Sequence, residues 1–307
     1  LTGFVKHPKR KKLLRVKTRT GREVTVTPDH SLFTSHNFRI YPIECKNLKI
    51  GSKIVLPSKM PCEYNNIEYL DLIELLPNFH LEGARNYIRI AVDKLGGKNC
   101  SEICEVPDIY RYFSNIKYAY SIGPVSRIKA TSFLELMNKS ETNFNHNYLR
   151  IKNITSNTLP AKLPINKDFC RFLGYFLSEG CIEGTSISIA TIQPAMINDL
   201  IYIYKSLFNQ KPRFRINYQA IGKSMKVMIN NSPLVELFSI LNLNRKSYEK
   251  KIPSFIYGLS IEKISSFLKG LYEGDGSFSG VRIEYHTTSK ELANDLLYLL
   301  FTFGIVA

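Results

Sequence analysis

The first sixty residues alternate between apolar and polar positions in short runs, which is the pattern of β-strands. The runs are LLRVKT, EVTVTP and KIVLP, and each is rich in β-branched residues. Glycines between successive runs provide turn positions. We therefore predict that residues 1–60 form an all-β segment.

The periodicity changes after residue 60. YLDLIELL and ATSFLELMN have apolar residues at helical spacing, whereas SIGP and NITSNTLP interrupt it. Residues 61–160 are therefore predicted to be a small, mostly helical domain. Its role stays open between a connector and a DNA-contacting domain.

From about residue 161 onward, two long helical runs end alike, as RFLGYFLSEG and FLKGLYEGDG. Glu179 and Asp275 are equivalent in these runs and lie 96 positions apart. The same offset aligns nine identical residues between positions 172–209 and the later segment. This repeat indicates a duplicated unit of helix, strands and helix, and it predicts a monomer that contains an internal pseudo-dimer.

Glycines occupy matched positions in both repeated helices. Gly174 and Gly270 lie inside the helices, where glycine costs about 1 kcal/mol relative to alanine. That cost is explained if the two backbones approach closely, so both are predicted to lie at a helix interface. Gly180 and Gly276 follow the acids, and we expect them to end the helices in the left-handed conformation.

The repeated acids predict a metal site. Glu179 and Asp275 would lie at helix C-termini, where the helix dipole disfavours negative charge. Pairing of the helices would bring the two carboxylates together, which a hard divalent cation such as Mg²⁺ would stabilise. The net charge of +16 favours a polyanionic partner, nucleic acid first. Together these features suggest phosphodiester hydrolysis by metal-activated water.

The two motifs FLGYFLSEG and LKGLYEGDG resemble those of LAGLIDADG homing endonucleases, and KKIPSFIYG ahead of the second motif is also similar to that family. The resemblance covers residues from about 165 to the end. It implies that Glu179 and Asp275 are metal-binding catalytic acids between two αββαββα halves, with Gly180 and Gly276 in the metal site. Mg²⁺ would be the cofactor and double-stranded DNA the substrate. The first motif departs from the family pattern by carrying Glu in place of Asp.

Two predicted hairpins have polar faces suited to DNA. RFRINYQ alternates strictly, AIGKS turns the chain, MKVMI returns, and VRIEYHT repeats the pattern. A two-stranded ribbon fits the major groove, where Arg, Asn and Gln suit base edges. The candidate DNA-binding residues are Arg213, Arg215, Asn217, Gln219, Lys223, Arg282, Glu284 and His286. The candidates for a catalytic lysine near the metal are Lys223, Lys226 and Lys290.

The segment GREVTVTPDHSLFT, with ECKNLKIGSKIVLP behind it, resembles the N-terminal half of the Hint fold of inteins. Ser52 stands where that family commonly has Asp. The resemblance implies that Thr27 and His30 activate an upstream scissile amide, with His30 protonating the leaving nitrogen during the acyl shift. The nucleophile would precede Leu1 and the closing His-Asn pair would follow Ala307. We therefore expect residues 1–307 alone neither to splice nor to cut DNA efficiently.

The overall expectation is an α+β chain with three domains. They are the N-terminal part of a Hint splicing domain (1–60), a helical connector or DNA-contacting domain (61–160), and a LAGLIDADG endonuclease domain with a truncated second half (161–307). The order of parts looks most like archaeal family-B DNA polymerase inteins. This implies flanking host segments (exteins) as partners and a DNA polymerase as host.

Two other functions remain open from the sequence. One is a LAGLIDADG-derived nucleic-acid-binding protein, such as an RNA maturase or a regulator, without cleavage. The other is a free-standing intron-encoded endonuclease, which would lack the Hint half. The scattered cysteines are expected to be free thiols in a reducing compartment, and no apolar run is long enough for a bilayer. We therefore expect a cytoplasmic protein without a membrane partner.

Overall fold

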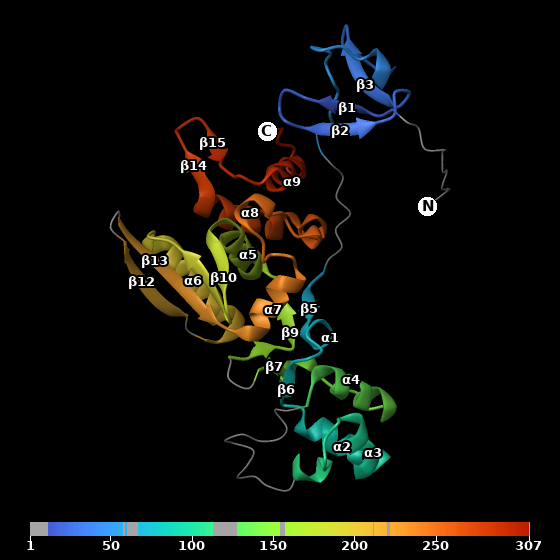
Figure 1. Ribbon diagram of the computed structural model, residues 1–307, viewed down its shortest axis with the longest axis vertical. Helices are drawn as coiled ribbons and strands as arrows, with labels where there is room; N and C mark the ends of the chain where they lie inside the picture. The colour runs from blue at the N-terminus through green and yellow to red at the C-terminus, as the bar shows by residue number, and fades with distance from the viewer. Residues whose placement is uncertain are drawn as a thin grey trace. The chain divides into compact units, whose positions relative to one another are not determined.

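The computed structural model describes residues 12–57, 59, 67–112, 128–153, 157–210, 212–219 and 222–306. Within these ranges, the side chains of residues 111–112, 213, 215–219 and 222–224 are not described. The chain divides into two compact units, Leu1–Cys62 with Lys290–Ala307, and Glu63–Ser289. It is a mixed α/β protein, and its helices and strands are labelled in Figure 1.

The first unit contains two antiparallel β-hairpins and the last helix described. Their bounds are β1 (Leu14–Lys17), β2 (Glu23–Val26), β3 (Ser31–His36), β4 (Arg39–Glu44) and α9 (Lys290–Phe301). β1 pairs with β2, and β3 pairs with β4. Asn37 and Phe38 turn the second hairpin with φ of 46° and 60°. Two consecutive positive φ angles are what a type I′ hairpin turn requires.

The KIVLP run was expected to be a strand and is not one. Its backbone is held to β3 by isolated hydrogen bonds instead of a ladder. The Val55 N–H donates to the Phe33 carbonyl at 2.8 Å, and the Thr34 hydroxyl donates to the Lys53 carbonyl at 2.7 Å. The run therefore lies beside β3 without forming a ladder with it.

Helix α9 packs on the first hairpin through two polar contacts. The Arg22 guanidinium lies 4.6 Å from the centre of the Phe301 ring, and Arg22 is only 6% exposed. Lys290 Nζ lies 2.6 Å from Glu23 Oε1, joining residues 267 positions apart. Arg15 contacts the same oxygen at 2.8 Å, and Arg15 and then Lys290 lower the pKa of Glu23 to about 2.

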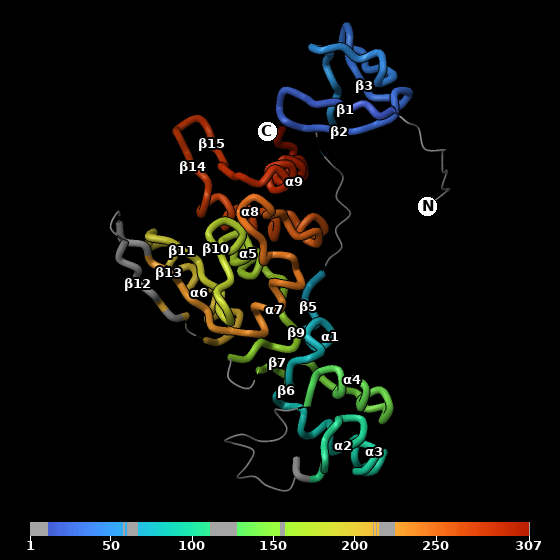
Figure 2. The backbone as a smooth tube through the Cα atoms, in the orientation of Figure 1, coloured from blue at the N-terminus to red at the C-terminus, as the bar shows by residue number. Residues whose placement is uncertain are grey.

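The second unit begins with a helical module. Its elements are β5 (Tyr69–Asp71), α1 (Leu72–Leu75), β6 (His80–Glu82), α2 (Arg85–Leu95), α3 (Gly97–Ile103), α4 (Ala130–Lys139), β7 (Arg150–Lys152), β8 (Leu159–Pro160) and β9 (Lys162–Pro164). β5 pairs with β9, so the module begins and ends on one short two-stranded sheet (Figure 2). The long helix expected at YLDLIELL is instead β5 followed by one helical turn, because Asp71 caps a new helix by accepting from the Ile73 N–H at 3.0 Å.

The first repeat follows in the order α-β-β-α-β-β-α. Its elements are α5 (Lys167–Glu179), β10 (Gly180–Glu183), β11 (Ser186–Ala190), α6 (Pro194–Phe208), β12 (Arg213–Gln219), β13 (Gly222–Asn230) and α7 (Ser232–Ile240). The four strands form one sheet in the order β10-β11-β13-β12. Alternate residues of β11 and β13 are buried on one face of this sheet, as period-2 patterning requires: Ile187, Ile189, Val227 and Ile229.

The second repeat contains α8 (Ile261–Asp275), β14 (Gly276–Phe278), β15 (Ile283–Tyr285) and then α9. These elements follow the order of α5, β10, β11 and α6 and lie at nearly the same 96-residue offset. The duplicated unit that the sequence predicts is therefore present in the secondary structure.

Helices α5 and α8 pack against each other along their length (Figure 1). A Cβ atom added at Gly174 would lie within 3.0 Å of the Phe267 carbonyl oxygen, and one at Gly270 equally close to the Arg171 carbonyl oxygen. Real Cβ atoms essentially never approach other atoms so closely. The two backbones therefore touch where the glycines lie, as the sequence predicts.

We expect Gly174→Ala to destabilise the second unit. Overpacking at this crossing should lower the free energy of unfolding by about 1–3 kcal/mol, which exceeds the gain of about 1 kcal/mol in helix propensity. Denaturant unfolding measures the change. Lys205→Ala, on the exposed side of α6, is the control and should stay within about 0.5 kcal/mol of the parent. An unchanged or raised stability for Gly174→Ala would contradict the backbone contact.

Candidate active site

The two repeated acids lie at the adjoining ends of α5 and α8. A Cβ atom added at Gly274, in the last turn of α8, would lie 3.2 Å from Glu179 Cγ. Burial raises the pKa of Glu179, and the nearby Asp275 raises it further, whereas Lys250 opposes both. The helix pairing thus holds two carboxylates close together in a partly desolvated site.

The glycines after the acids do not adopt the left-handed conformation that we expected. Gly180 has φ −88° and ψ 149°, and Gly276 has φ −87° and ψ 153°. Both are extended because each helix continues directly into a strand, β10 or β14. Their need for glycine is steric, since an added Cβ would lie within 3.0 Å of the carbonyl oxygen four residues earlier, that of Phe176 or Tyr272.

Lys250 is a functional candidate that the sequence analysis missed. Its ammonium donates to the Ser178 carbonyl at 2.6 Å, and its own carbonyl accepts from the Ser289 hydroxyl at 2.5 Å. Burial lowers the pKa of Lys250, while Asp275 and Glu179 act to raise it. The available signal was its place as the first residue of KKIPSFIYG, but only the fold brings it to the carboxylates.

Tyr285 is a second missed residue. Its hydroxyl donates to Asp275 Oδ2 at 3.4 Å, and its ring packs edge-on to Tyr272 at 5.4 Å. Burial and then Asp275 raise the pKa of Tyr285, so the phenol stays protonated and can donate. Tyr285 thereby fixes the orientation of one catalytic candidate.

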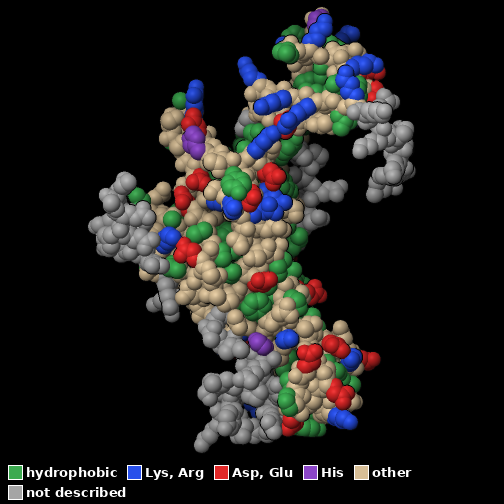
Figure 3. All heavy atoms as spheres, in the orientation of Figure 1, with side chains coloured by type: hydrophobic (Ala, Val, Ile, Leu, Met, Phe, Trp, Pro, Cys, Tyr) green, Lys and Arg blue, Asp and Glu red, His purple; other side chains and the backbone are tan. Residues whose placement is uncertain are grey.

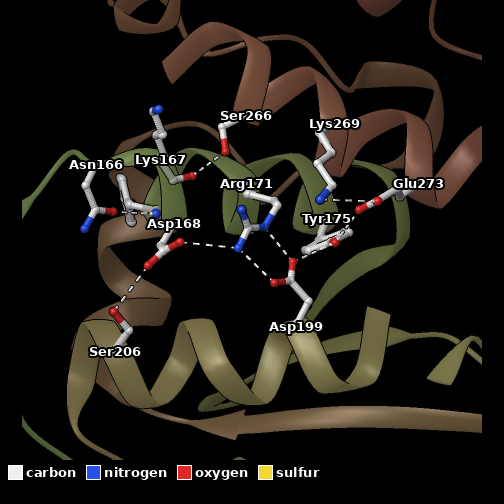
Figure 4. A network of polar contacts seen from close by, with 11 residues as sticks. Asn166, Lys167, Asp168, Arg171, Tyr175, Asp199, Ser206, Ser266, Lys269 and Glu273 are labelled. Carbon is white, nitrogen blue, oxygen red and sulfur yellow. Dashed lines mark hydrogen bonds and ion pairs between the residues drawn. The ribbon is translucent and has the colours of Figure 1, made fainter. Parts of the chain in front are cut away.

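A polar network behind the acids joins three helices (Figure 4). Arg171 on α5 contacts Asp199 on α6 through two nitrogens, at 2.5 and 2.8 Å. The Tyr175 hydroxyl lies 2.9 Å from Asp199 and also contacts Glu273 on α8. Burial and then these hydrogen bonds raise the pKa of Tyr175. Because Glu273 lies two residues before Asp275, the network steadies the end of α8.

A cavity of about 230 Å³ lies beside Glu179. Its lining includes Thr191, Gln193, Met196 and Glu273. The site is therefore open to water and to a ligand on the Glu179 side.

The donor set fits Mg²⁺. Among the described residues, no group of three or more His, Cys, Asp or Glu side chains could hold a metal. Mg²⁺ is usually bound by one or two carboxylates together with waters and substrate phosphates. Two carboxylates, one of which has a pKa raised by burial and by its neighbour, match that requirement.

Two of the lysines that the sequence suggested as catalytic are paired with other acids. Lys226 contacts Glu183 at 2.6 Å on the four-stranded sheet, and Lys290 contacts Glu23 in the first unit. The side chain of Lys223 is outside the described residues.

Five of the eight DNA-binding candidates, Lys223 among them, can be placed only by backbone. β12 is the edge strand of its sheet, but the side chains of Arg213, Arg215, Asn217 and Gln219 lie outside the described set. Around β15, Arg282 is exposed, and the side chains of Glu284 and His286 are 46% and 75% exposed with 3.7 Å between Oε2 and Nε2. This polar face of the second repeat is accessible to a large ligand.

The Thr27–His30 block forms a tight turn. The His30 N–H donates to the Thr27 carbonyl at 3.1 Å, and the His30 carbonyl accepts from the Cys45 N–H at 2.9 Å. The turn is thus anchored at the end of β4, with His30 exposed.

The positive charge is unevenly distributed along the chain. Residues 1–60 contain 14 basic and 3 acidic residues, residues 61–160 contain 11 of each, and residues 161–307 contain 17 and 12. Acidic and basic side chains both lie over the helical module on the face seen in Figure 3. Residues 61–160 therefore contribute nothing to the net charge of +16.

The family model described as a LAGLIDADG-like domain matches residues 262–307, which include Asp275 at the end of α8. The model described as the intein splicing domain matches residues 1–166, more than half of the chain. The chain belongs to the intein family.

Proteins that are similar in sequence to this chain have different names. The chain is 28% identical over 96% of its length to an uncharacterized protein of Methanocaldococcus jannaschii. It is 24% identical over 99% of its length to the DNA-directed RNA polymerase subunit Rpo1C of the same organism, and 24% identical over 99% to the DNA polymerase II large subunit of Thermococcus kodakarensis. It spans 33%, 28% and 16% of these relatives, respectively.

Among solved structures, the chain is similar to I-DmoI in complex with its target DNA, nicked in the coding strand, in the presence of manganese. The likeness has 15% identity and a TM-score of 0.35, and covers 46% of this chain and 79% of that one. A TM-score of 0.35 is too low to establish a shared fold. In the described part of the chain, no helix is both long and apolar enough to cross a membrane.

We expect Glu179→Gln to stabilise the metal-free protein at neutral pH. Since the pKa of Glu179 is raised above its usual 4.5, the ionised form destabilises the fold. This destabilisation is complete above the raised pKa and disappears below 4.5, so the advantage of Gln should vanish on acidification. Thermal melts in EDTA across that range measure it.

Glu262→Gln is the matched control for this prediction. Ser260 lowers the pKa of Glu262, so this variant should show no stabilisation at neutral pH. A Glu179→Gln protein that is less stable than the parent at neutral pH would mean that the carboxylate is not electrostatically strained.

Proposed function

We propose that this chain is an intein that carries a site-specific double-strand DNA endonuclease. The observation that supports this best is the pair Glu179 and Asp275 at the touching ends of two glycine-packed helices, with Lys250 beside them. A nucleic-acid-binding protein without cleavage would need neither the paired acids nor the half-buried lysine. A free-standing endonuclease would not contain the intein splicing domain that matches here.

In the proposed mechanism, the carboxylates of Glu179 and Asp275 would hold Mg²⁺, together with the backbone at Gly180 and Gly276. When bound, Mg²⁺ supplies a Lewis acid and a water of lowered pKa. Tyr285 keeps Asp275 oriented through its hydrogen bond. Lys250 can stabilise the negative charge that develops on the phosphoryl oxygens, since its ammonium is already held among the acids.

DNA would lie across the polar faces of the two repeats. β12 and β13 form the ribbon of the first repeat, and β14 and β15 form that of the second. A two-stranded ribbon fits the major groove. We assign residues 161–307 to the endonuclease domain. Residues 61–160 are proposed to be a connector, because their zero net charge gives them no attraction for the phosphate backbone.

Residues 1–60 are proposed to supply part of the splicing domain. Thr27 and His30 would activate the upstream scissile amide, which the exposed turn at His30 permits. The host is proposed to be a DNA polymerase, since relatives include DNA polymerase proteins. The described cysteines are free thiols, which supports a reducing, cytoplasmic setting.

We expect Asp275→Asn to abolish Mg²⁺-dependent cleavage while leaving DNA binding. The reason is that the amide keeps the shape of the side chain but loses the charge that binds the metal. The protein in its complete reading frame is incubated with a randomised duplex library and Mg²⁺, and cleaved ends are sequenced. Binding is measured separately by gel shift in Ca²⁺. Glu291→Gln, exposed on α9, is the control and should cut normally; cutting by Asp275→Asn would remove the assigned role.

Lys250→Met should lower the single-turnover cleavage rate by about 10²-fold or more, because one preorganised positive group is lost from the site. Affinity for the selected DNA in Ca²⁺ should change little. Lys246→Met, four residues earlier and exposed, is the control and should retain the parent rate. An equal, small effect of both variants would assign Lys250 a structural role only.

A further inference from the structure

An acid and a lysine meet on the polar face of the four-stranded sheet. Glu183 ends β10 and Lys226 lies on β13, with β11 between the two strands. Lys226 Nζ donates to Glu183 Oε1 at 2.6 Å, and the Ser188 hydroxyl of β11 donates to the same oxygen at 3.0 Å. Cys181 Sγ lies 3.4 Å from it. The two charged groups therefore converge above the middle of β10, β11 and β13.

This pair is ordered yet reachable from solvent. The side chains of Glu183 and Lys226 are 33% and 28% exposed, whereas Ser188 beneath them is 1% exposed. The three donors share Oε1 and so orient the carboxylate. The second oxygen, Oε2, can accept a further hydrogen bond. Lys226 and then Ser188 lower the pKa of Glu183, so the carboxylate is ionised at neutral pH.

A fixed carboxylate is unsuited to phosphate contact. It repels the backbone of DNA, and a partly exposed ion pair adds little to stability. In a major groove, however, a carboxylate can accept from the N4 amino group of cytosine, and a lysine can donate to O6 and N7 of guanine. A donor and an acceptor side by side match the groove edge of one G·C base pair, which presents guanine acceptors beside a cytosine donor.

We propose that Glu183 and Lys226 together read one G·C base pair of the DNA target, with Lys226 contacting guanine and Glu183 contacting cytosine. This inference rests on the proposed function, because it requires that the sheet face enters the major groove. It gives Lys226 a role in specificity in place of the catalytic role that its sequence position suggested.

The second repeat has a comparable arrangement. Glu284 on β15 occupies the repeat position of Ser188 on β11, and it lies 3.7 Å from His286. Each repeat therefore carries an acid beside a basic side chain on its polar face. A purely phosphate-binding surface would not be expected to place an acid there in both halves.

The test is selection of bound DNA from a randomised duplex library in Ca²⁺, by the protein in its complete reading frame and by Glu183→Gln. The parent should select a consensus that includes one strongly preferred G·C pair. Glu183→Gln keeps the side-chain shape, so thermal melts should show it folded. The preference at that pair should fall about tenfold or more, or move toward A·T, because Gln suits adenine. Preferences at the other positions should stay unchanged.

Two further variants distinguish a failure of this inference from a failure of the proposed endonuclease function. Lys205→Gln, exposed on α6, should select the parent consensus. Lys226→Gln should weaken the same single position as Glu183→Gln. If both variants keep the parent preference, or if they weaken binding equally at every position, the base-reading role is wrong while the endonuclease proposal stands. If the parent itself selects no consensus, the proposed site-specific function fails, and this inference fails with it.

Discussion

The contact of α5 with α8 is the constraint on which the rest of the second unit depends. At Gly174 and Gly270 each helix approaches the backbone of the other so closely that neither position has room for a Cβ atom. Helices with larger residues there would be held further apart, at the 8–10 Å separations that side chains set. The close approach brings the two helix ends together, and with them Glu179 and Asp275. Every property of the candidate site follows from that proximity.

The proximity is electrostatically unfavourable, and the surrounding groups respond to it. Burial and the neighbouring carboxylate raise the pKa of Glu179, while burial lowers the pKa of Lys250. A partly desolvated lysine and two carboxylates form a site with one negative charge in excess when all three are ionised, which a bound cation would offset. Tyr285 donates a hydrogen bond to Asp275. The Arg171–Asp199–Tyr175–Glu273 network joins α5, α6 and α8 (Figure 4). These hydrogen-bonded groups therefore come from α5, α6, α8 and β15.

The family assignment and the candidate active site depend on different residues of the chain. The intein splicing model matches residues 1–166, while the paired acids lie beyond that range. The net charge is +11 in residues 1–60, zero in residues 61–160 and +5 in residues 161–307. The proposed splicing and DNA chemistry therefore depend on separate parts of one chain, and the LAGLIDADG-like match at residues 262–307 contains Asp275 but not Glu179.

The sequence by itself determined the repeat, the helix-interface glycines and the two acids, because identical residues at a fixed offset report a duplicated fold before any contact is known. It predicted helices and strands where the spacing of apolar residues within one segment is sufficient, as in α4, α5 and β13. It could not determine which lysine reaches the acids: Lys250 precedes α8 by eleven residues, and only tertiary packing places its ammonium on the Ser178 carbonyl. The extended Gly180 and Gly276, the single turn of α1 and the pairing of Lys226 with Glu183 were likewise decided by tertiary structure. Lys250 and Lys226 contact partners that are distant in sequence, and local patterning contains no information about such partners.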